Sequence, residues 1–294
     1  MADIVGQAEI RSIDIQKFVT GFADEDIVFK KACKQVRTTA REIRWQQKTS
    51  GFVAPATTTG ITANLIDNTS ERSLPAVANQ SWTRNTSYVK KYFVTSETIS
   101  MEDIKDSQVD IRATTARDLL RAVAARVDVS IYDVITDGSG IETTAAVADG
   151  WDDVATGNPI KDLLTGIRKI RVNGYIIDAK RHGQLWIHPI EHENLMNYLI
   201  SIKGSSIPTT SSNLLAQGAV MEILNLDVIV STNATTDEAT IIIPGVTATW
   251  YTFTPITSAI IEDPGIGIKI RVWEEGIATL DNPKSCHVTT DTVV

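Results

Sequence analysis

The longest regular pattern of apolar positions in the chain covers residues 110–135. Apolar residues recur there every three or four positions, and the segment contains neither proline nor glycine. This spacing places the apolar side chains on one face of an α-helix, which at 1.5 Å per residue would be about 39 Å long. Asp137 and the Gly138-Ser139-Gly140 turn follow it. The sequence therefore predicts a long amphipathic helix that stops at this turn.

The chain before this helix shows three different patterns. Residues 24–47 have helix-like apolar spacing and are predicted to form a helix. Residues 49–87 are rich in Thr, Ser, Asn, Ala and Gly and poor in bulky apolar residues, so we expect them to be disordered or packed on another molecule. Residues 88–99 are aromatic and β-branched, which predicts a strand. Ser100 and Ser107, each followed three residues later by an aspartate, predict two successive helix starts.

The chain after residue 150 mixes helix and strand patterns. Asn158 and Pro159 predict the start of a helix that runs to residue 172, with Gly174 at its C-terminal cap. Pro189 opens a second predicted helix, residues 190–203. Short apolar or alternating runs predict strands at 184–188, 226–231, 240–243 and 266–273. The fold class expected from these patterns is α+β.

The net charge of −8 argues against a protein that binds DNA over its whole surface. One segment, Lys30 to Lys48, is an exception, because seven basic residues face a single acid there and its net charge is +6. We consider two interpretations: an arm that contacts nucleic acid or an acidic neighbour, and a solvated face of the predicted helix. The second is the more common origin of such a run.

No arrangement of residues predicts catalysis, a cofactor or a metal ion. Cys33 and Cys286 lie far apart with no partner pattern. His188 and His192 are four apart, which is a metal-ligand spacing, but Pro189 pushes His188 out of the helical region. We therefore expect His188 to cap a helix. An α/β enzyme built on residues 150–260 is a rival interpretation, but no convergent polar site supports it.

The order of these parts resembles the major capsid proteins of tailed double-stranded DNA viruses, which have the Hong Kong 97-like fold. In that family an arm and an extended loop precede a long spine helix, a mixed α/β domain and closing strands. The stretches that carry the resemblance are 88–106, 110–140, 158–174, LWIHPIEHENLMNYL, 221–231 and 268–289. Asn225 stands where the family commonly has glycine, so the tightness of that turn is in question.

The resemblance implies an α+β Hong Kong 97-like capsid fold with five parts. These are an N-terminal arm (1–48), an extended β loop (49–98), a peripheral domain with the spine helix (99–149), a mixed α/β axial domain (150–257), and closing strands that return to both domains (258–294).

The implied function is self-assembly, as hexamers and pentamers, into the icosahedral shell that encloses the double-stranded DNA genome of a tailed virus. The partners implied are the chain itself, a portal protein, a scaffold or decoration protein, and packaged DNA bound without sequence specificity; no membrane, cofactor or enzymatic activity is implied. The location is the virion, with assembly in the host cytoplasm. An alternative is an encapsulin-type nanocompartment shell protein, which shares this fold.

The residues expected at the assembly interface belong to the extended loop, whose tip we place at residues 67–80. They are Asp67, Glu71, Arg72, Trp82 and Arg84. Some shells of the family are cross-linked by a bond between a loop lysine and an asparagine. This chain has no lysine between Thr49 and Val89, so we do not expect that cross-link.

Overall fold

The computed structural model describes residues 28–47, 52–54, 60–62, 71, 82–106, 111–146, 149–153, 156–202 and 222–293. The chain divides into two compact units. Unit 1 comprises Met1–Ile43, Ser87–Ile131 and Trp250–Ala278, and unit 2 comprises Arg44–Thr86, Tyr132–Thr249 and Thr279–Val294.

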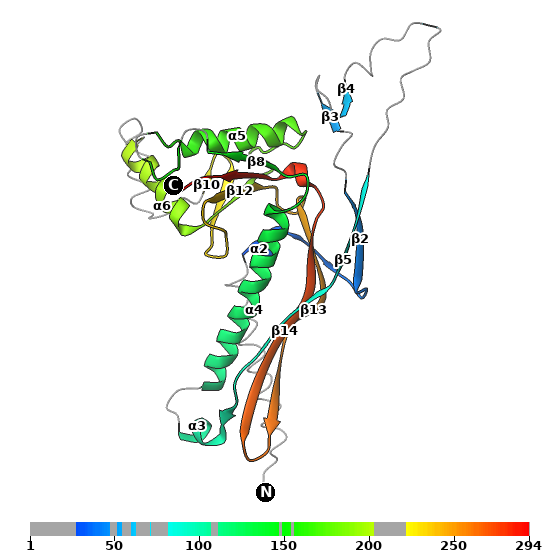
Figure 1. Cartoon of the computed structure of the whole chain (residues 1–294), viewed down its shortest axis with the longest axis vertical. Coiled ribbons are helices and arrows are strands. Elements are labelled where there is room, and N and C mark those ends of the chain that lie inside the picture. Colours follow the sequence, from blue (N-terminus) through cyan, green and yellow to red (C-terminus); the bar gives the residue numbers. More distant parts are fainter. Residues whose placement is uncertain are drawn as a thin grey trace. The chain divides into compact units, whose positions relative to one another are not determined.

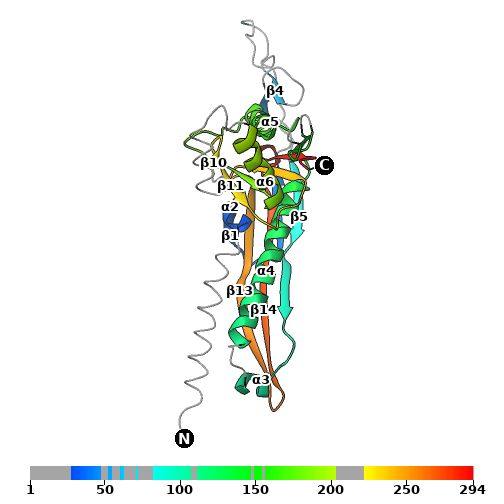
Figure 2. The same ribbon diagram turned by 90° about the vertical axis from the view of Figure 1, so that its left-hand side faces the viewer.

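Unit 1 is built around the long helix α4 (Ile111–Thr136), which confirms the helix predicted over residues 110–135. A five-stranded sheet accompanies it, in the order β1-β13-β14-β6, with β7 also paired to β14. Its strands are β1 (Lys34–Arg37), β6 (Lys90–Thr95), β7 (Ile99–Ser100), β13 (Ala248–Asp263) and β14 (Gly267–Leu280). Both views of the chain show β13 and β14 as a long hairpin beside α4 (Figures 1 and 2).

The core of unit 1 lies between α4 and this sheet. Ala116, Leu120 and Ala124 of the helix are fully buried against Ile270 and Val272 of β14. Residues 268–272 alternate between buried and more accessible positions, as the period-2 pattern predicted. The helical stripe and the alternating strand therefore bury each other's apolar faces.

The helix predicted for residues 24–47 is wrong where the structure describes it. Only α2 (Phe29–Ala32) is helical, and the chain then forms β1 (Lys34–Arg37) and β2 (Glu42–Gln47). The physical reason is tertiary: β1 pairs with β13 and β2 pairs with β5, so backbone groups find partners far away in sequence. Because the apolar spacing over this segment is short and interrupted by threonines, strand pairing outweighs it.

Residues 88–106, which precede α4, contain the strand and the helix start that the sequence predicted. The strand expected over residues 88–99 is present as β6 and β7. The Ser100 hydroxyl then accepts a hydrogen bond from the Asp103 backbone N–H at 3.0 Å, at the start of α3 (Met101–Asp106). This confirms the first predicted cap, whereas Ser107 lies outside the described residues.

Unit 2 contains a six-stranded mixed sheet in the order β10-β11-β9-β12-β15-β8. Its strands are β8 (Glu142–Ala145), β9 (Gly183–Ile187), β10 (Glu222–Ile223), β11 (Leu226–Val230), β12 (Glu238–Ile242) and β15 (His287–Thr290). β11 pairs with β9 and β15 with β8 in parallel, while β12 is antiparallel to both of its neighbours. The strands predicted at 184–188, 226–231 and 240–243 are three of the four inner strands of this sheet, and β15 is the fourth.

Helices α5 (Pro159–Val172) and α6 (Pro189–Asn197) complete unit 2, and both begin as predicted. The Asn158 side chain caps α5 through the Lys161 N–H, and the His188 side chain caps α6 through the Ile190 N–H. A π-helix (Tyr198–Ile202) extends α6, so the predicted helix 190–203 is helical throughout its described part. Leu163 and Ile167 of α5 pack against Leu185 and Ile241 of the sheet.

The β10–β11 turn resolves the question raised by Asn225. Leu224 and Asn225 adopt left-handed backbone conformations, with φ of 53° and 62°. Asparagine tolerates this region better than most residues, so the turn is tight without the glycine.

Two short ribbons involve the segment expected to be the extended loop (49–98), although one of their strands, β2, lies in the segment expected to be the arm (1–48). β2 (Glu42–Gln47) pairs with β5 (Thr83–Tyr88), and β3 (Phe52–Ala54) pairs in parallel with β4 (Gly60–Thr62). The segment therefore contains more strand than its polar composition suggested.

Candidate assembly surface

The structure describes three of the five residues expected at the assembly interface, Glu71, Trp82 and Arg84. Asp67 and Arg72 lie outside the described residues, and Glu71 is described only as an exposed turn residue. Trp82 directly precedes β5, and 56% of its surface is exposed. Arg84, within β5, is also exposed. An indole with this exposure is unusual for a side chain that gains so much from burial.

The base of the β2–β5 ribbon is fixed to the end of β14. The Trp45 indole N–H and the Gln47 side-chain amide both donate to the Leu280 carbonyl, at 3.1 and 3.2 Å. Asn85 of β5 donates to the Gln47 side-chain oxygen at 3.0 Å. β2 is thereby bonded directly to the Leu280 carbonyl, and β5 is linked to it through Gln47, so the root of the loop is fixed.

The face of the unit 1 sheet opposite α4 carries a second group of exposed residues. Lys91 and Phe93 of β6 alternate with Tyr92 and Val94, so they project away from the helix, and Phe93 is 63% exposed. Glu275 lies across from Lys91 in register and forms ion pairs with it at 3.5 Å and with Arg41 at 3.6 Å. The strand period of two, which puts Lys91 and Phe93 on one side and Tyr92 and Val94 on the other, is the signal that could have located this face.

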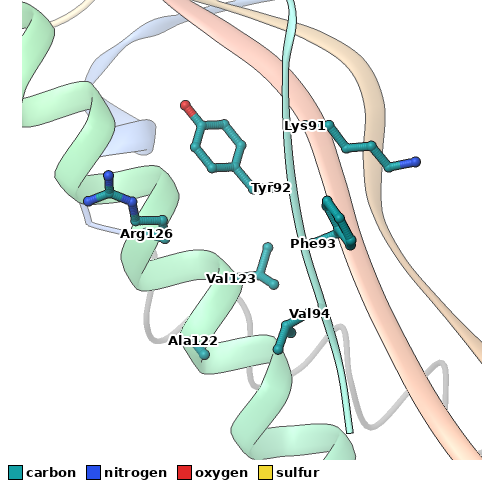
Figure 3. A pocket seen from close by; sticks show the side chains of 7 residues that line it. All are labelled: Lys91, Tyr92, Phe93, Val94, Ala122, Val123 and Arg126. Atoms are coloured by element: carbon teal, nitrogen blue, oxygen red, sulfur yellow. The ribbon is translucent and has the colours of Figure 1, made fainter.

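A groove of about 280 Å³ lies between β6 and α4 on the helix side. Figure 3 shows Tyr92 and Val94 projecting toward Val123 and Arg126, while Lys91 and Phe93 point the other way. The Tyr92 hydroxyl is hydrogen bonded to the Ser130 Oγ at 2.7 Å. The lining is mostly apolar and presents no pair of groups arranged for acid–base chemistry.

Residues 28–30, in the segment expected to be the arm, are attached to α4 and β14 through buried acidic side chains. The Asp128 carboxylate, fully buried on α4, accepts hydrogen bonds from the backbone N–H groups of Val28, Phe29 and Lys30. The Lys30 ammonium pairs with the buried carboxylate of Glu274. The basic segment singled out in the sequence therefore meets acidic residues of its own chain at Lys30 and, through Glu275, at Arg41.

A buried histidine lies under α5 in unit 2. The His287 imidazole is 1% exposed, and its Nε2 is 2.9 Å from the Thr144 hydroxyl. Lys169 donates to the same hydroxyl at 2.6 Å. Burial, together with the nearby Lys169 ammonium, lowers the pKa of His287 to about 4, so the ring is neutral at physiological pH.

Over the described ranges, no group of three or more His, Cys, Asp or Glu side chains is placed to hold a metal ion. Likewise, none of the helices in the described part of the chain is long and apolar enough to cross a membrane.

Solved structures of low sequence identity share this architecture. The virus-like particle from Pyrococcus furiosus superposes with a TM-score of 0.61 at 11% identity, covering 94% of this chain and 97% of that chain. The capsid of cyanophage P-SCSP1u gives 0.63 at 10% identity, over 90% of this chain and 88% of that chain. Mycobacterium phage Che8 gives 0.62 at 15% identity, over 91% and 92%. No curated protein sequence shows significant similarity to the chain.

The long helix on its sheet and the separate mixed α/β unit thus define the class: an α+β protein of the Hong Kong 97-like capsid fold, as expected from the sequence. The model of the phage capsid protein family matches residues 84–286, more than two thirds of the 294 residues. The chain belongs to the phage capsid protein family, and it is a capsid shell protein.

Proposed function

We propose that the chain is the major capsid protein of a tailed virus, whose hexamers and pentamers build an icosahedral shell around a double-stranded DNA genome. The observation that carries this proposal is the family match over residues 84–286. A structural role without catalysis, a location in the virion and assembly in the host cytoplasm belong to the same proposal. So do the partners expected beyond the chain itself, namely a portal protein, a scaffold or decoration protein, and packaged DNA.

The domain limits taken from the resemblance are also part of the proposal. Unit 1, with α4 and the β13–β14 hairpin, corresponds in content to the peripheral domain, and unit 2, with its six-stranded sheet, to the axial domain. We propose residues 1–48 as the arm and 49–98 as the extended loop.

The extended loop is proposed to contact another copy of the chain. Its root is fixed by the hydrogen bonds of Trp45 and Gln47 to Leu280, while Trp82 and Arg84 remain exposed. A fixed root with an exposed indole suits a segment that buries its apolar surface only on assembly. Asp67, Glu71 and Arg72, at the loop tip, are proposed to join that contact.

Replacement of residues 67–80 by a short Gly-Ser turn tests the role of the loop. We expect the unassembled subunit to unfold at nearly the wild-type temperature, because the segment contributes to a neighbouring subunit rather than to its own core. Negative-stain images should show few or no closed particles. Normal shells from this variant would remove the tip from the interface, and loss of folding would place it inside the domain.

A single substitution, Trp82→Ala, tests the same contact with less change to the loop. Its control is Ile190→Ala, which removes another exposed apolar side chain, on α6. The expected result is a lower shell yield for Trp82→Ala alone. Equal yields for both variants would contradict the proposed contact.

A nanocompartment shell is the second candidate, because the virus-like particle from Pyrococcus furiosus matches almost the whole of both chains. Particles purified after nuclease treatment distinguish the two functions. Protected double-stranded DNA, with genes for a portal and a packaging motor beside the gene of this protein, supports the viral shell. Particles that contain a protein cargo and no protected DNA support the compartment.

A further inference from the structure

The outer face of α5 is basic and apolar at once. Lys161, Leu164, Arg168 and Val172 lie three or four residues apart, so they form one row on the side opposite the buried Leu163, Ile167 and Ile170. Leu164 is 48% exposed and Val172 is 57% exposed. An apolar row on the polar side of an amphipathic helix is the pattern of a surface covered by another molecule.

The loop after α5 extends this row. The Arg171 guanidinium donates to the Ile177 carbonyl at 2.7 Å, which holds the returning chain against the end of the helix. Ile176, next to that carbonyl, is 59% exposed. The single acid of α5, Asp162, is buried and accepts a hydrogen bond from the Trp151 indole at 2.9 Å, so no acid of the helix offsets the exposed cations.

The β10 edge of the six-stranded sheet of unit 2 is acidic, in contrast to the basic outer face of α5. Glu222 of β10 and Asp227 of β11 are direct cross-strand partners, and both side chains are more than half exposed. Like charges in this position repel each other and destabilise the pair. Within the described residues the neighbouring His182 is their ion-pair partner, at 3.8 and 3.5 Å, and its imidazole carries charge only when protonated.

Apolar surface accompanies this acidic pair. Leu224 in the β10–β11 turn is 36% exposed, and Val230 at the end of β11 is 38% exposed. Leu224 also has a left-handed backbone conformation, which is rare for a bulky side chain. The edge therefore presents acids next to apolar residues, the complement of the basic and apolar row on α5.

The two surfaces cannot be one self-complementary patch, because they belong to different parts of unit 2. α5 packs over β12 and β15, toward the β8 side of the sheet (Figure 1). Glu222 and Asp227 lie on β10 and β11, at the other edge of the sheet. Contact between two different patches of identical subunits is heterologous, and repetition of such a contact closes a ring when the rotation allows it.

We infer that the outer face of α5 in one subunit docks on the β10–β11 edge of the next copy, with Arg168 facing the Glu222 and Asp227 carboxylates. The inference rests on the proposed assembly into rings of five and six and adds the surfaces that meet within each ring. The contact buries the exposed leucine, valine and isoleucine side chains and supplies the acidic pair with a cation from the neighbouring subunit.

A charge exchange tests this pairing. Arg168→Glu is expected to lower the yield of closed shells by about tenfold or more, since like charges across an interface are costly. Asp227→Lys alone should also lower the yield, and the double variant Arg168→Glu with Asp227→Lys should restore it. Arg168→Glu with Asp118→Lys is the matched control, because Asp118 is an exposed acid on α4 and its change restores net charge only.

Disulfide trapping adds a direct measure of proximity. Both native cysteines, Cys33 and Cys286, are buried, so new surface thiols report on their own neighbours. Shells of the double variant Arg168→Cys with Asp227→Cys should form reductant-sensitive multimers on oxidation, whereas Arg168→Cys with Asp118→Cys should remain monomeric on the gel.

The outcomes separate the inference from the proposed function. Wild-type protein that forms no shell or ring, alone or with its genomic neighbours, overturns the function and with it the pairing. If the wild type assembles, then normal shells from Arg168→Glu, equal rescue by Asp118→Lys, or absence of the 168–227 cross-link overturns the pairing and leaves the function standing.

Discussion

The attachment of the arm through Asp128 allows a quantitative test. In Asp128→Ala, the N–H groups of Val28, Phe29 and Lys30 lose the carboxylate that accepts them at 2.8, 3.4 and 3.3 Å. Loss of a helix cap costs about 0.5 to 2 kcal/mol, and a buried donor left without an acceptor costs about 1 to 3 kcal/mol. Because the three groups share one carboxylate, we expect a total loss of about 2 to 4 kcal/mol.

Asp128→Asn separates hydrogen bonding from charge. The amide oxygen still accepts from the arm, and the neutral side chain avoids the cost of burying a carboxylate, so we expect a loss of about 1 kcal/mol or less. Burial raises the pKa of Asp128 above its ordinary value, although the three N–H groups act in the opposite direction. A raised folded-state pKa means that the contribution of this group to stability is greatest at low pH and falls as pH rises through that pKa. The stability of the asparagine variant relative to the wild type should therefore increase as the pH rises above the ordinary range of an aspartate pKa.

The assay combines denaturant unfolding of the unassembled subunit with hydrogen exchange at residues 28–30. Asp118→Ala, which removes an exposed acid of the same helix, serves as control and should change stability by less than about 0.5 kcal/mol. A loss below about 0.5 kcal/mol for Asp128→Ala, or unchanged exchange of the three amides, would refute the reasoning.

Three further predictions follow from other parts of the chain. Ala124→Pro, at a fully buried position in the middle of α4, should cost about 3 kcal/mol or more through a lost hydrogen bond and a ring clash, and a soluble variant of wild-type stability in denaturant would contradict this. His287 has a folded pKa of about 4, below the unfolded value near 6.5, so the unfolded chain binds the proton first as the pH is lowered. The free energy of unfolding should therefore fall by up to about 3 kcal/mol as the pH is lowered from about 6.5 to about 4. His287→Gln should lack this part of the pH dependence, and identical melting curves against pH for both proteins would be inconsistent with it. Boiled shells should run as one band near 32.1 kDa, because no lysine lies between residues 49 and 89, and a reductant-resistant ladder would show that cross-linking occurs elsewhere.

Several of these features were predictable because their causes are local. The 26 residues of α4 needed only a periodic apolar stripe without glycine or proline. The caps at Ser100, Asn158 and His188 followed from the short reach of a side chain to a backbone N–H two or three residues ahead. Trp82 and Arg84, two of the residues expected at the assembly interface, are exposed, but their contact with a neighbouring subunit stays a prediction.

Other features depended on contacts between segments far apart in sequence. The β13 strand (Ala248–Asp263) was missed because Pro255 and mixed polar positions hide its pattern, and its neighbours β1 and β14 supply the pairing. Residues 34–47 became strands for the same reason, since the partners of their backbone groups lie on β13 and β5.

By itself, the sequence determined the long helix, the caps, most inner strands and the α+β class, because helical period and capping depend on neighbours within four residues. Only the tertiary structure decided that Lys30 and Arg41 of the basic segment pair with Glu274 and Glu275. It also decided that Glu222 and Asp227 lie together at the β10 edge of unit 2, apart from the cations of α5. The physical reason is that charge pairing and strand pairing depend on distance in space, which the order of residues along the chain does not specify.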